Sequence, residues 1–338
     1  MAVRPPEQAT QKARPAHPGS VTLPCVHEAP NTNHTDPRVE GETPLIDVVV
    51  VSYKSAATLR GCVEPLAAMP GVHVTVVDNA SPDDSVATVA DLDIDLVLAP
   101  RNGGFAYGCN LGSRRGSAPL LLFINPDARI DEASLRALAG ALEADPRAAL
   151  ASPRIHDEDG SLAYSLRRFP RLRSTFAKAL FLHRAWPLAA WSDELVRDPA
   201  AYERPGHAEW VSGACMLVRR DAYEALGGFD DGLFLYCEDT DLCRRLWQAG
   251  HAVRYEPAAV VHHVGGASSG AGETQAIAAR SRVYYARKHQ GRVAAAVERL
   301  GVALDETTHA LASIARPASR RGHLKALRAA LAPLGETG

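Results

Sequence analysis

Apolar runs of strand length and of helix length alternate over residues 45–153. The β-branched run Leu45–Val51 is typical of a strand buried on both faces of a parallel sheet. A helix is predicted from Ser81, because Ser81 suits the N-cap, Pro82 the first helical position and Asp84 the third. Further strands are predicted at 72–77, 94–99 and 120–124, and helices at 55–69, 105–115 and 132–144. This alternation predicts an α/β fold with a doubly wound sheet flanked by helices.

The remainder of the chain has a less regular pattern. His156–Gly160 is typical of a hairpin turn, and residues 165–207 are too basic, aromatic and proline-broken for their pattern to assign an element. The later predictions are a strand at 210–219, a helix at 238–249 and extended chain at 253–264. Residues 1–43 are rich in Pro, Thr, His and Asn and have no apolar period, which predicts a disordered tail. Residues 271–338 carry 11 Lys or Arg against five Asp or Glu, and they predict a basic helical extension.

Composition excludes several classes of protein. A chain of 338 residues with 46% apolar and 22% charged residues is ordinary globular protein, and its net charge of −2 gives no global field for nucleic acid. No run approaches about 18 consecutive apolar residues, so no transmembrane helix is predicted. No secretion signal is predicted, because the polar and proline residues Arg4–Glu7 stand where its apolar core would begin. The six cysteines are far apart and form no C-x-x-C pair, which favours reduced thiols in a cytosolic protein.

Sheets of this kind bind ligands beyond the carboxyl ends of their strands, so the residues after each strand decide the chemistry. The first strand is followed by Ser52–Ala57 with no glycine before Gly61, which excludes the glycine-rich turn of a nicotinamide-dependent dehydrogenase. Lys54 is the single cation there, so a nucleotidyltransferase that grips a triphosphate is also disfavoured. A nucleotide-sugar enzyme needs instead a carboxylate for the nucleoside, carboxylates for a metal and a general base.

Three strand ends offer donor-binding or metal-binding groups. Asp127 directly follows a buried strand and suits Mg²⁺, which needs only one or two carboxylates beside substrate phosphates. Asp78 and Asn79 would accept hydrogen bonds from a pyrimidine and a ribose, and Asn102–Gly104 would bring backbone N–H groups to a phosphate. The alternatives are a cap residue before the helix at Glu132, an Asx turn at Asp78 and an ordinary turn at Asn102.

Two later segments add a base and a further metal ligand. The carboxylates in Glu238–Asp241 repel each other, which raises at least one pKa and suits a general base. The alternative is that these acids stabilise the dipole of the helix they begin. A neutral imidazole of His262 or His263 would ligate a metal, and the alternative is a pair of surface histidines.

Taken together and in this order, these segments resemble the family 2 glycosyltransferases over about residues 45–290. The runs that carry the resemblance are Val48–Tyr53, Val77–Ser81, Asn102–Phe105 with Asn110, Asn125–Asp127, Gly213, Met216–Arg220, Gly227–Asp230, Phe234, Glu238–Leu242 and His263–Ser268. Each run is short, but their order is specific. Within the family, the Asn-Pro-Asp triplet and the later Gly-Gly-Phe-Asp run resemble bacterial rhamnosyltransferase-like members.

The resemblance implies a GT-A domain over 44–270, with a donor half at 44–153 and an acceptor half at 154–270. It also implies inverting transfer of a sugar from a nucleotide-activated donor. The residues that match the donor-binding positions are Ser52 and Tyr53 in the nucleotide pocket, Asp78 at the base, and Asn102 and Gly103 in the loop near the donor.

The resemblance assigns the metal and the base as well. Asp127 matches the last acid of the DXD-type motif, and Asn125 replaces its first acid. His263 matches the metal-side histidine by its spacing to Ser268, with His262 as the alternative. Asp239 matches the catalytic base, and Glu238 stands beside it. The implied cofactor is Mg²⁺ or Mn²⁺.

The implied donor is dTDP-L-rhamnose, with a UDP-hexose as the alternative. The implied acceptor is a bacterial surface glycan or lipid-linked saccharide, reached in the cytoplasm at the inner face of the plasma membrane. The extension would touch anionic lipid through Arg280, Arg282, Tyr284, Tyr285, Arg287 and Lys288, or else be a helix packed on the domain. A non-catalytic glycan-binding relative is disfavoured by Asp127 and by the pair Glu238 and Asp239.

Overall fold

We describe the protein from a computed structural model, in residues 45–263 and 271–333. These residues all belong to one compact unit, Glu42–Gly338. The tail predicted over 1–43 and the run Val264–Ser268 of the family resemblance lie outside the described residues. The division of the chain into a donor half and an acceptor half stays a prediction.

The described strands form one large mixed sheet and one small sheet. The strands are β1 (Ile46–Ser52), β2 (Val72–Asp78), β3 (Asp95–Leu98), β4 (Leu120–Ile124), β5 (Ala128–Ile130), β6 (Ala148–Asp157), β7 (Leu162–Ala163), β8 (Leu166–Arg167), β9 (Gly206–His207), β10 (Trp210–Val211), β11 (Cys215–Arg219) and β12 (Ala252–His263). The large sheet has the order β3-β2-β1-β4-β11-β6-β12-β5, with β7 beside β6 and β9 beside β12. β1, β2, β3 and β4 are mutually parallel, whereas β11 runs antiparallel to β4 and β6.

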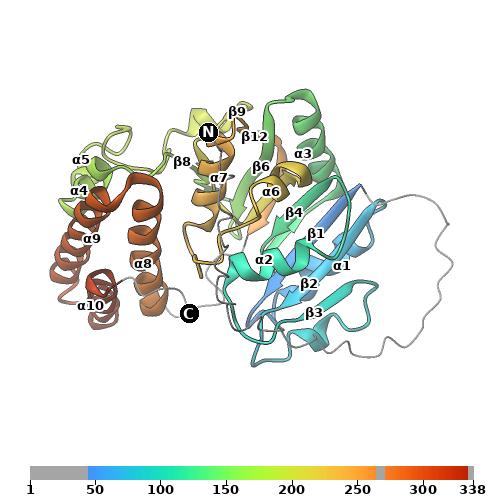
Figure 1. Ribbon diagram of the computed structural model, residues 1–338, viewed down its shortest axis with the longest axis horizontal. Coiled ribbons are helices and arrows are strands. Elements are labelled where there is room, and N and C mark those ends of the chain that lie inside the picture. The colour runs from blue at the N-terminus through green and yellow to red at the C-terminus, as the bar shows by residue number, and fades with distance from the viewer. Residues whose placement is uncertain (1–44, 264–270, 334–338) are drawn as a thin grey trace, which may run out of the picture. The chain divides into compact units, whose positions relative to one another are not determined.

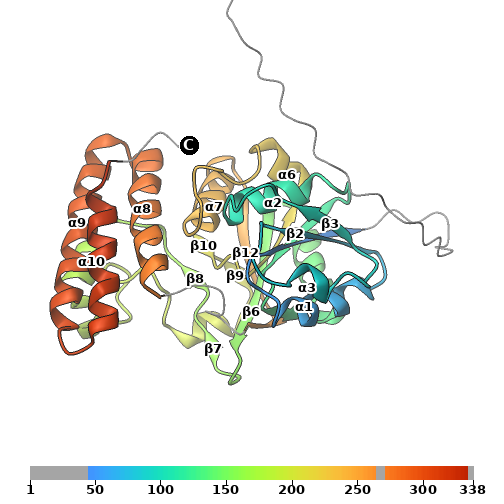
Figure 2. The ribbon, with the colours of Figure 1, turned by 90° about the horizontal axis from the view of Figure 1, so that it is seen from below.

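Helices cover both faces of the large sheet, as the sequence predicts (Figures 1 and 2). The helices are α1 (Leu59–Ala67), α2 (Phe105–Ser113), α3 (Glu132–Ala144), α4 (Leu172–Ala179), α5 (Leu182–Ala185), α6 (Arg220–Ala225), α7 (Glu238–Gln248), α8 (Ala271–Gln290), α9 (Arg292–Ala312) and α10 (Pro317–Leu331). Figure 2 shows α1 and α3 on one face of the sheet and α2, α6 and α7 on the other.

The residues of β1 show how the sheet divides the core. Val48 and Val50 point to the side of α1 and α3, and Val49 and Val51 point to the side of α2, α6 and α7. All four are buried, because successive residues of a strand face opposite sides and both sides are covered. The run Val48–Val51 is therefore apolar at every position because both faces of its strand are covered, as the sequence predicts.

The helix predicted from Ser81 is wrong. In its place the chain makes a turn followed by a short 3-10 segment, Val86–Thr88. The Ser81 N–H donates to Asp78 Oδ2 at 3.1 Å, so this carboxylate makes the Asx turn that was the alternative. Asp83 Oδ2 and Ser85 Oγ accept from the backbone N–H groups of Ala56 and Ser55. These side chains bind the neighbouring loop and are not free to cap a helix of their own.

The strand predicted at 210–219 is two strands in different sheets. β10 pairs with β8 in the small sheet, and β11 lies in the large sheet between β4 and β6. The intervening residues 212–214 therefore pass between the two sheets. The hairpin predicted around His156–Gly160 is confirmed, since β6 and β7 pair in antiparallel fashion across it.

The C-terminal part of the described chain is helical, as predicted. α8, α9 and α10 pack on one another, and α4 packs against α9. No helix in the described ranges is long and apolar enough to cross a membrane. The five cysteines at positions 62, 109, 215, 237 and 243 form no disulfide within the described part.

Candidate active site

The acidic pair Glu238 and Asp239 begins α7, at a point where the backbone is strained. Tyr236 and Cys237, the two residues before it, both have a φ of +67°, a left-handed conformation that is uncommon for residues other than glycine. Asp239 Oδ2 accepts from the Gly213 N–H at 3.0 Å. Its Oδ1 accepts from its neighbour, the N–H of residue 240, at 2.7 Å. The carboxylate is therefore held in one orientation by backbone donors from two segments.

Burial changes the acidity of both members of the pair. It raises the pKa of Glu238 well above its usual range, and the neighbouring charge of Asp239 raises it further. Burial also raises the pKa of Asp239, while its backbone hydrogen bonds and the charge of Arg167 act in the opposite direction. Glu238 Oε2 is buried and has no hydrogen-bond partner among the described residues. The pKa values of two adjacent carboxyl groups are thus both raised above their ordinary values.

A cavity of about 470 Å³ opens onto this pair. Asn125, at the end of β4, lies on its wall together with both acids. Arg167 of β8, Glu194 and Arg282 of α8 complete the charged part of the lining. Strands and helices far apart in sequence are therefore gathered around one space.

Arg167, Trp210 and Arg282 line the cavity, although the sequence predicts none of them as a donor-binding, metal or catalytic residue. The Arg167 guanidinium lies over the Trp210 ring, with its central carbon 5.2 Å from the ring centroid. Arg167 makes no ion pair with any described residue. It lies in the segment whose sequence pattern assigned no element, so no sequence signal placed it beside the acidic pair.

Asn125, Asp127 and His263 meet at the other end of the site. His263 Nε2 lies 3.1 Å from Asp127 Oδ1 and 3.3 Å from Asn125 Nδ2. β12 pairs with β5 so that His263 is opposite Ala128, the residue after Asp127. The neighbouring His262 ring lies 5.9 Å from the His156 ring, because successive side chains of a strand face opposite sides. The geometry thus brings His263, and not His262, to Asp127.

The residues present suit a hard divalent cation. Two ligand atoms in adjacent positions of an octahedron, each about 2.1 Å from Mg²⁺, are about 3 Å apart, which is close to the 3.1 Å between Asp127 Oδ1 and His263 Nε2. The described residues contain no group of three or more His, Cys, Asp or Glu side chains placed to hold a metal. An ion at this point would therefore need ligands from substrate or water as well.

The predicted donor-binding residues gather at the carboxyl ends of β1 and β2. Ser52 and Asp78 are opposite each other in the strand register. Ser52 Oγ and Asp78 Oδ1 are both buried, and neither has a hydrogen-bond partner among the described residues. Tyr53 follows directly, with Lys54 Nζ 5.3 Å from its ring centroid. An unpaired buried carboxylate oxygen is costly, so Asp78 is available to a donor group from a ligand.

Asn79 organises the loop that contains Asn102 and Gly103. Its Nδ2 donates to Asn102 Oδ1 at 3.1 Å and to the Gly104 carbonyl at 3.0 Å. Its Oδ1 accepts from the Gly103 N–H at 3.1 Å. The sequence offers Asn79, beside Asp78, as an acceptor for the nucleoside, but both ends of its amide are bonded within the protein. Its role here is to hold the loop.

Gly104 joins this loop to the segment before α7. Its φ is +90°, and a Cβ atom there would lie 2.0 Å from the carbonyl oxygen of Phe234. The same carbonyl accepts from the Phe105 N–H at 2.9 Å. The donor-side loop and the approach to the acidic pair are therefore in direct contact, and no larger residue would allow it.

The predicted residues are thus brought together in two adjoining groups. Asn125, Glu238 and Asp239 line the large cavity. Asp127 lies outside its lining and is connected to it through His263 and Asn125. The remaining predicted residues, Ser52, Tyr53, Asp78, Asn102 and Gly103, also lie outside that lining, at the ends of β1 and β2 and in the following loops.

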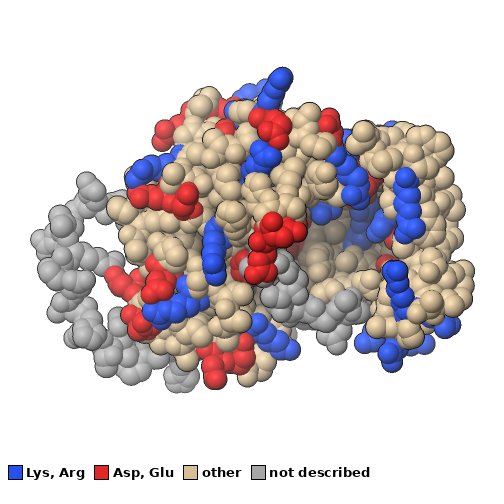
Figure 3. Space-filling view, turned by 180° about the vertical axis from the view of Figure 1, so that it is seen from behind, with Lys and Arg blue, Asp and Glu red and all other residues tan. Residues whose placement is uncertain are grey.

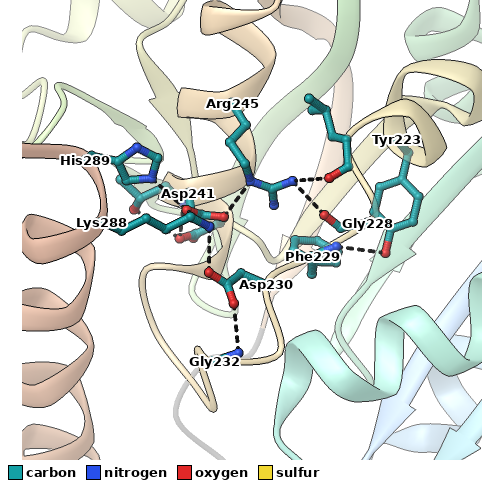
Figure 4. Close-up of polar contacts among 12 residues, drawn as sticks. Tyr223, Gly228, Phe229, Asp230, Gly232, Asp241, Arg245, Lys288 and His289 are labelled. Carbon is teal, nitrogen blue, oxygen red and sulfur yellow. Dashed lines mark hydrogen bonds and ion pairs between the residues drawn. The ribbon is translucent and has the colours of Figure 1, made fainter. Parts of the chain in front are cut away.

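Asp241, the third acid of the run, is part of an ionic network and not of the cavity (Figure 4). It is fully buried and lies 2.7 Å from each of Arg245 Nε, Lys288 Nζ and His289 Nε2. Burial alone would raise the pKa of Asp241, but the hydrogen bond from His289 and the charges of Arg245 and Lys288 lower it to about 2. Lys288 Nζ also lies 2.5 Å from Asp230 Oδ2. The network ties α7 to α8.

Most of the side chains expected to touch lipid are engaged inside the protein. Arg282 is paired with Glu194 and Glu298, and Lys288 with Asp230 and Asp241. The two tyrosines of that set are also taken up, Tyr284 by a hydrogen bond to Asp230 and Tyr285 by burial. For these four residues the packed-helix alternative is correct, because α8 faces the acidic groups of α7 and α9.

Comparison with known proteins gives a family and several relatives. The family model described as glycosyl transferase family 2 matches residues 47–227. N-acetylglucosaminyl-diphospho-decaprenol L-rhamnosyltransferase of Mycobacterium tuberculosis is 32% identical over 268 residues, which cover 74% of this chain and 86% of that protein. Rhamnosyltransferase WbbL of Escherichia coli is 33% identical over 142 residues, 41% of this chain and 49% of that protein.

Two solved structures share the fold. The mannosyltransferase of Pyrobaculum calidifontis, in complex with GDP-Man and Mn²⁺, has a TM-score of 0.53 at 17% identity and 86% coverage of both chains. GalNAc-T7, with UDP, GalNAc and Mn²⁺, has a TM-score of 0.52 at 15% identity and covers 75% of this chain and 52% of that one. The GT-A fold expected from the sequence is thereby confirmed.

Proposed function

The chain belongs to glycosyl transferase family 2, and on that premise we propose that it is an inverting glycosyltransferase whose donor is dTDP-L-rhamnose. The proposed acceptor is a hydroxyl of a bacterial cell-surface glycan or a lipid-linked saccharide. The likeness to two rhamnosyltransferases supports the donor sugar. A UDP-hexose remains the alternative, because both donors carry a pyrimidine and Asp78 would bind either.

One observation carries the proposal. The acidic pair Glu238 and Asp239 and the strand-end residue Asn125 face the same cavity of about 470 Å³. Asn125 is in turn in contact with His263, which reaches Asp127. Transfer of a sugar needs a base on the side of the acceptor and charge compensation on the side of the leaving group, and in the proposed assignment this arrangement would supply both.

Asp239 is the proposed general base. It would take the proton of the acceptor hydroxyl as that oxygen forms a bond to C1 of the sugar and the bond from C1 to the diphosphate oxygen breaks. The backbone donors at Gly213 and residue 240 fix its orientation, and its raised pKa makes it a stronger base than an exposed carboxylate. Glu238, whose pKa is raised well above its usual range, would hold its proton more tightly than an exposed carboxyl group.

Asp127 and His263 are the proposed ligands of a divalent cation. Such an ion, Mg²⁺ or Mn²⁺, would offset the charge that the nucleoside diphosphate gains as it leaves. The lone pair of His263 Nε2 would bind the ion and would then no longer accept from Asn125 Nδ2, so the contact of 3.3 Å between these two atoms would give way on metal binding. The Mn²⁺ complexes of the two structural relatives support a divalent cation.

The nucleotide of the donor is proposed to bind at the ends of β1 and β2. Asp78 Oδ1 would accept from the N–H of the pyrimidine, and Ser52 and Tyr53 would line the same pocket. Asn102 and Gly103 would border the donor from the loop that Asn79 holds. In this assignment residues 44–153 form the donor half and residues 154–270 the acceptor half.

The acceptor is proposed to enter through a second cavity, of about 460 Å³. It shares five lining residues with the first, among them Arg167, Tyr236 and Arg282, and it extends to His309 of α9 and His323 of α10. Figure 3 shows the surface hollowed between the C-terminal helices and the rest of the domain, with Lys and Arg on the walls. A lipid-linked acceptor would be met at the cytoplasmic face of the membrane.

A thermal-shift screen of nucleotide sugars with and without Mn²⁺ tests the proposal. A donor bound only by the folded chain raises the melting temperature in proportion to ln(1 + [L]/Kd). We expect the largest shift with dTDP-L-rhamnose and Mn²⁺ together, and Mn²⁺-dependent release of dTDP from it. A larger shift with a UDP-hexose would replace the donor, and no shift with any nucleotide sugar would refute the proposal.

A further inference from the structure

The outward surface of α9 and α10 carries charge of one sign. Within these two helices and the short connection between them, every exposed charged side chain is basic. These residues are Arg292, Arg316, Arg320, Arg321, Lys325 and Arg328. α10 contains no acidic residue at all. The net charge of the whole chain is −2, so this surface departs from the rest of the molecule.

The acidic residues of α9 face inward instead. Glu298 is fully buried and paired with Arg282 of α8. Asp305 lies 3.3 Å from Lys178 Nζ of α4, and Glu306 Oε2 lies 2.7 Å from the ring of His323 of α10. The acids therefore hold the helices together, and the cations are left to the solvent side.

An apolar stripe runs along the same outward surface. Val293, Leu300, Leu304 and Leu311 follow one another at spacings of seven, four and seven residues, which places them on one side of α9. Their exposed fractions are 81%, 63%, 37% and 64%. On α10, Leu324 and Leu331 repeat the spacing of seven, and the connection adds Ile314 at 63%. Among the described residues nothing covers this stripe.

The segment after α4 extends the apolar surface. Trp186 is 53% exposed and Leu188 is 67% exposed, and the Trp186 and Trp191 rings are 5.9 Å apart. Thr308 Oγ1 donates to the Ala179 carbonyl at 2.8 Å, so the start of this segment is attached to the C-terminal half of α9. Tryptophan is enriched where a protein meets the boundary between lipid and water.

We propose that this outward surface of α9 and α10, with the 180–191 segment, docks the protein on an anionic lipid bilayer. Helices that lie in a bilayer interface combine an aliphatic stripe with flanking cations, and this surface has both. A second copy of the chain would bring cations against cations, which disfavours self-association through the same surface. Figures 1 and 2 both place α9 and α10 on the side of α8 that faces away from the sheet, where a flat bilayer can reach them.

The inference extends the proposed function without depending on the donor. The second cavity is lined by inward-facing residues of α9 and α10, so its lining and the proposed docking surface are opposite faces of the same helices. Vesicle binding requires no nucleotide sugar, and release of dTDP from the donor requires no vesicle. The failure of one proposal is therefore distinguishable from the failure of the other.

The charge component is tested by flotation of the full chain with vesicles of phosphatidylcholine, with and without phosphatidylglycerol. We expect binding only with phosphatidylglycerol, and weaker binding as salt is raised. Arg320→Glu with Arg321→Glu should lower the partition coefficient by at least about 25-fold, since each cation near the surface contributes about fivefold. The matched control is Arg114→Glu with Arg115→Glu, two adjacent exposed arginines after α2, which should leave binding within about twofold.

The apolar component is tested with Leu300→Gln and Leu311→Gln together, which should weaken binding about tenfold or more. Leu98→Gln, at an exposed leucine of β3, is the control. All variants change exposed side chains, so unchanged thermal unfolding is expected. The proposal is overturned if the wild-type chain ignores phosphatidylglycerol or if the control variants weaken binding as much. It is also overturned if the chain self-associates in solution and the Leu300 and Leu311 substitutions abolish that association instead.

Discussion

Replacing Asp241 by Asn should destabilise the folded chain and disturb the helix that carries the acidic pair. The Asp241 carboxylate is fully buried and lies 2.7 Å from Arg245, Lys288 and His289 (Figure 4). Asn has nearly the same shape but no charge, and it offers one acceptor oxygen in place of two. Arg245 and Lys288 then lose their negatively charged partner at a buried position, where water makes up for only part of the lost attraction.

The size of the effect follows from the acidity of the group. The pKa of Asp241 is lowered from 3.8 to about 2, which corresponds to about 2.5 kcal/mol of stability at neutral pH. Breaking a buried ion pair from one side costs about 3–5 kcal/mol when the remaining charge stays buried. Lys288 retains 30% of its side-chain exposure, so it recovers part of its hydration. We therefore expect a loss of about 2–4 kcal/mol in the free energy of unfolding.

The pH dependence gives a second signature. The pKa is lower in the folded chain than in the unfolded chain, so this stability is present in full above the unfolded value of 3.8. It is lost as the pH falls from that value towards about 2. Asp241→Asn lacks the titrating group, and the difference between the two proteins should therefore shrink over the same interval.

Urea unfolding at a series of pH values, with Glu143→Gln as an exposed control, measures both signatures. A double-mutant cycle with Lys288→Met should give a coupling energy of about 1–3 kcal/mol, because the two groups are in direct contact. The reasoning is refuted if Asp241→Asn costs less than about 0.5 kcal/mol, or if the two substitutions are additive. A loss that stays constant through the acid range would refute the assigned pKa.

Three further outcomes follow from the geometry of the site. Asp127→Ala and His263→Ala should each abolish the Mn²⁺-dependent part of donor affinity by calorimetry, while His262→Ala, whose ring faces His156, should keep it. Gly104→Ala should lower the free energy of unfolding, measured with urea, by more than about 2 kcal/mol, because its Cβ would lie 2.0 Å from a backbone oxygen. The control is Gly140→Ala in α3, where an added Cβ meets open space, and it should be neutral or stabilising. Glu238→Gln should raise the melting temperature at neutral pH. The reason is that the pKa of Glu238 is raised in the folded chain, so the stability of the wild-type chain falls as the pH rises above the ordinary value of 4.5. The gain should vanish below that pH, and an equal gain at all pH values would contradict the prediction.

The first half of the fold was predictable because its strands are buried on both faces. Runs such as Ile46–Val51 and 120–124 are stable only between two covered faces, and the polar residues at their ends then fall on one edge of the sheet. The local sequence pattern could not decide whether His262 or His263 lies beside Asp127. That choice depends on the register of β12 against β5, which is set by pairing between distant segments.

The failures have a common physical origin in contacts across long sequence separations. Ser81, Asp83 and Ser85 have the residue types of a helix start, but they bind the loop after β1 about 30 residues away. Arg167 reaches the cavity from a two-residue strand in a segment without periodicity. The sequence left open whether Lys288 touches lipid or packs on the domain, because its partners Asp230 and Asp241 are about 50 residues earlier.

The central claim is that Asp239 removes the proton of the acceptor hydroxyl. A second part of the claim is that Asp239 takes no part in the metal-dependent binding of the donor. The most direct measurement is turnover and donor affinity of Asp239→Asn beside the wild-type chain, with Mn²⁺ and the donor found by the thermal-shift screen. We predict unchanged donor affinity and a turnover about 10²–10⁴-fold lower, the usual contribution of a positioned base. Turnover near that of the wild-type chain, with the variant folded and the donor bound, would contradict the account.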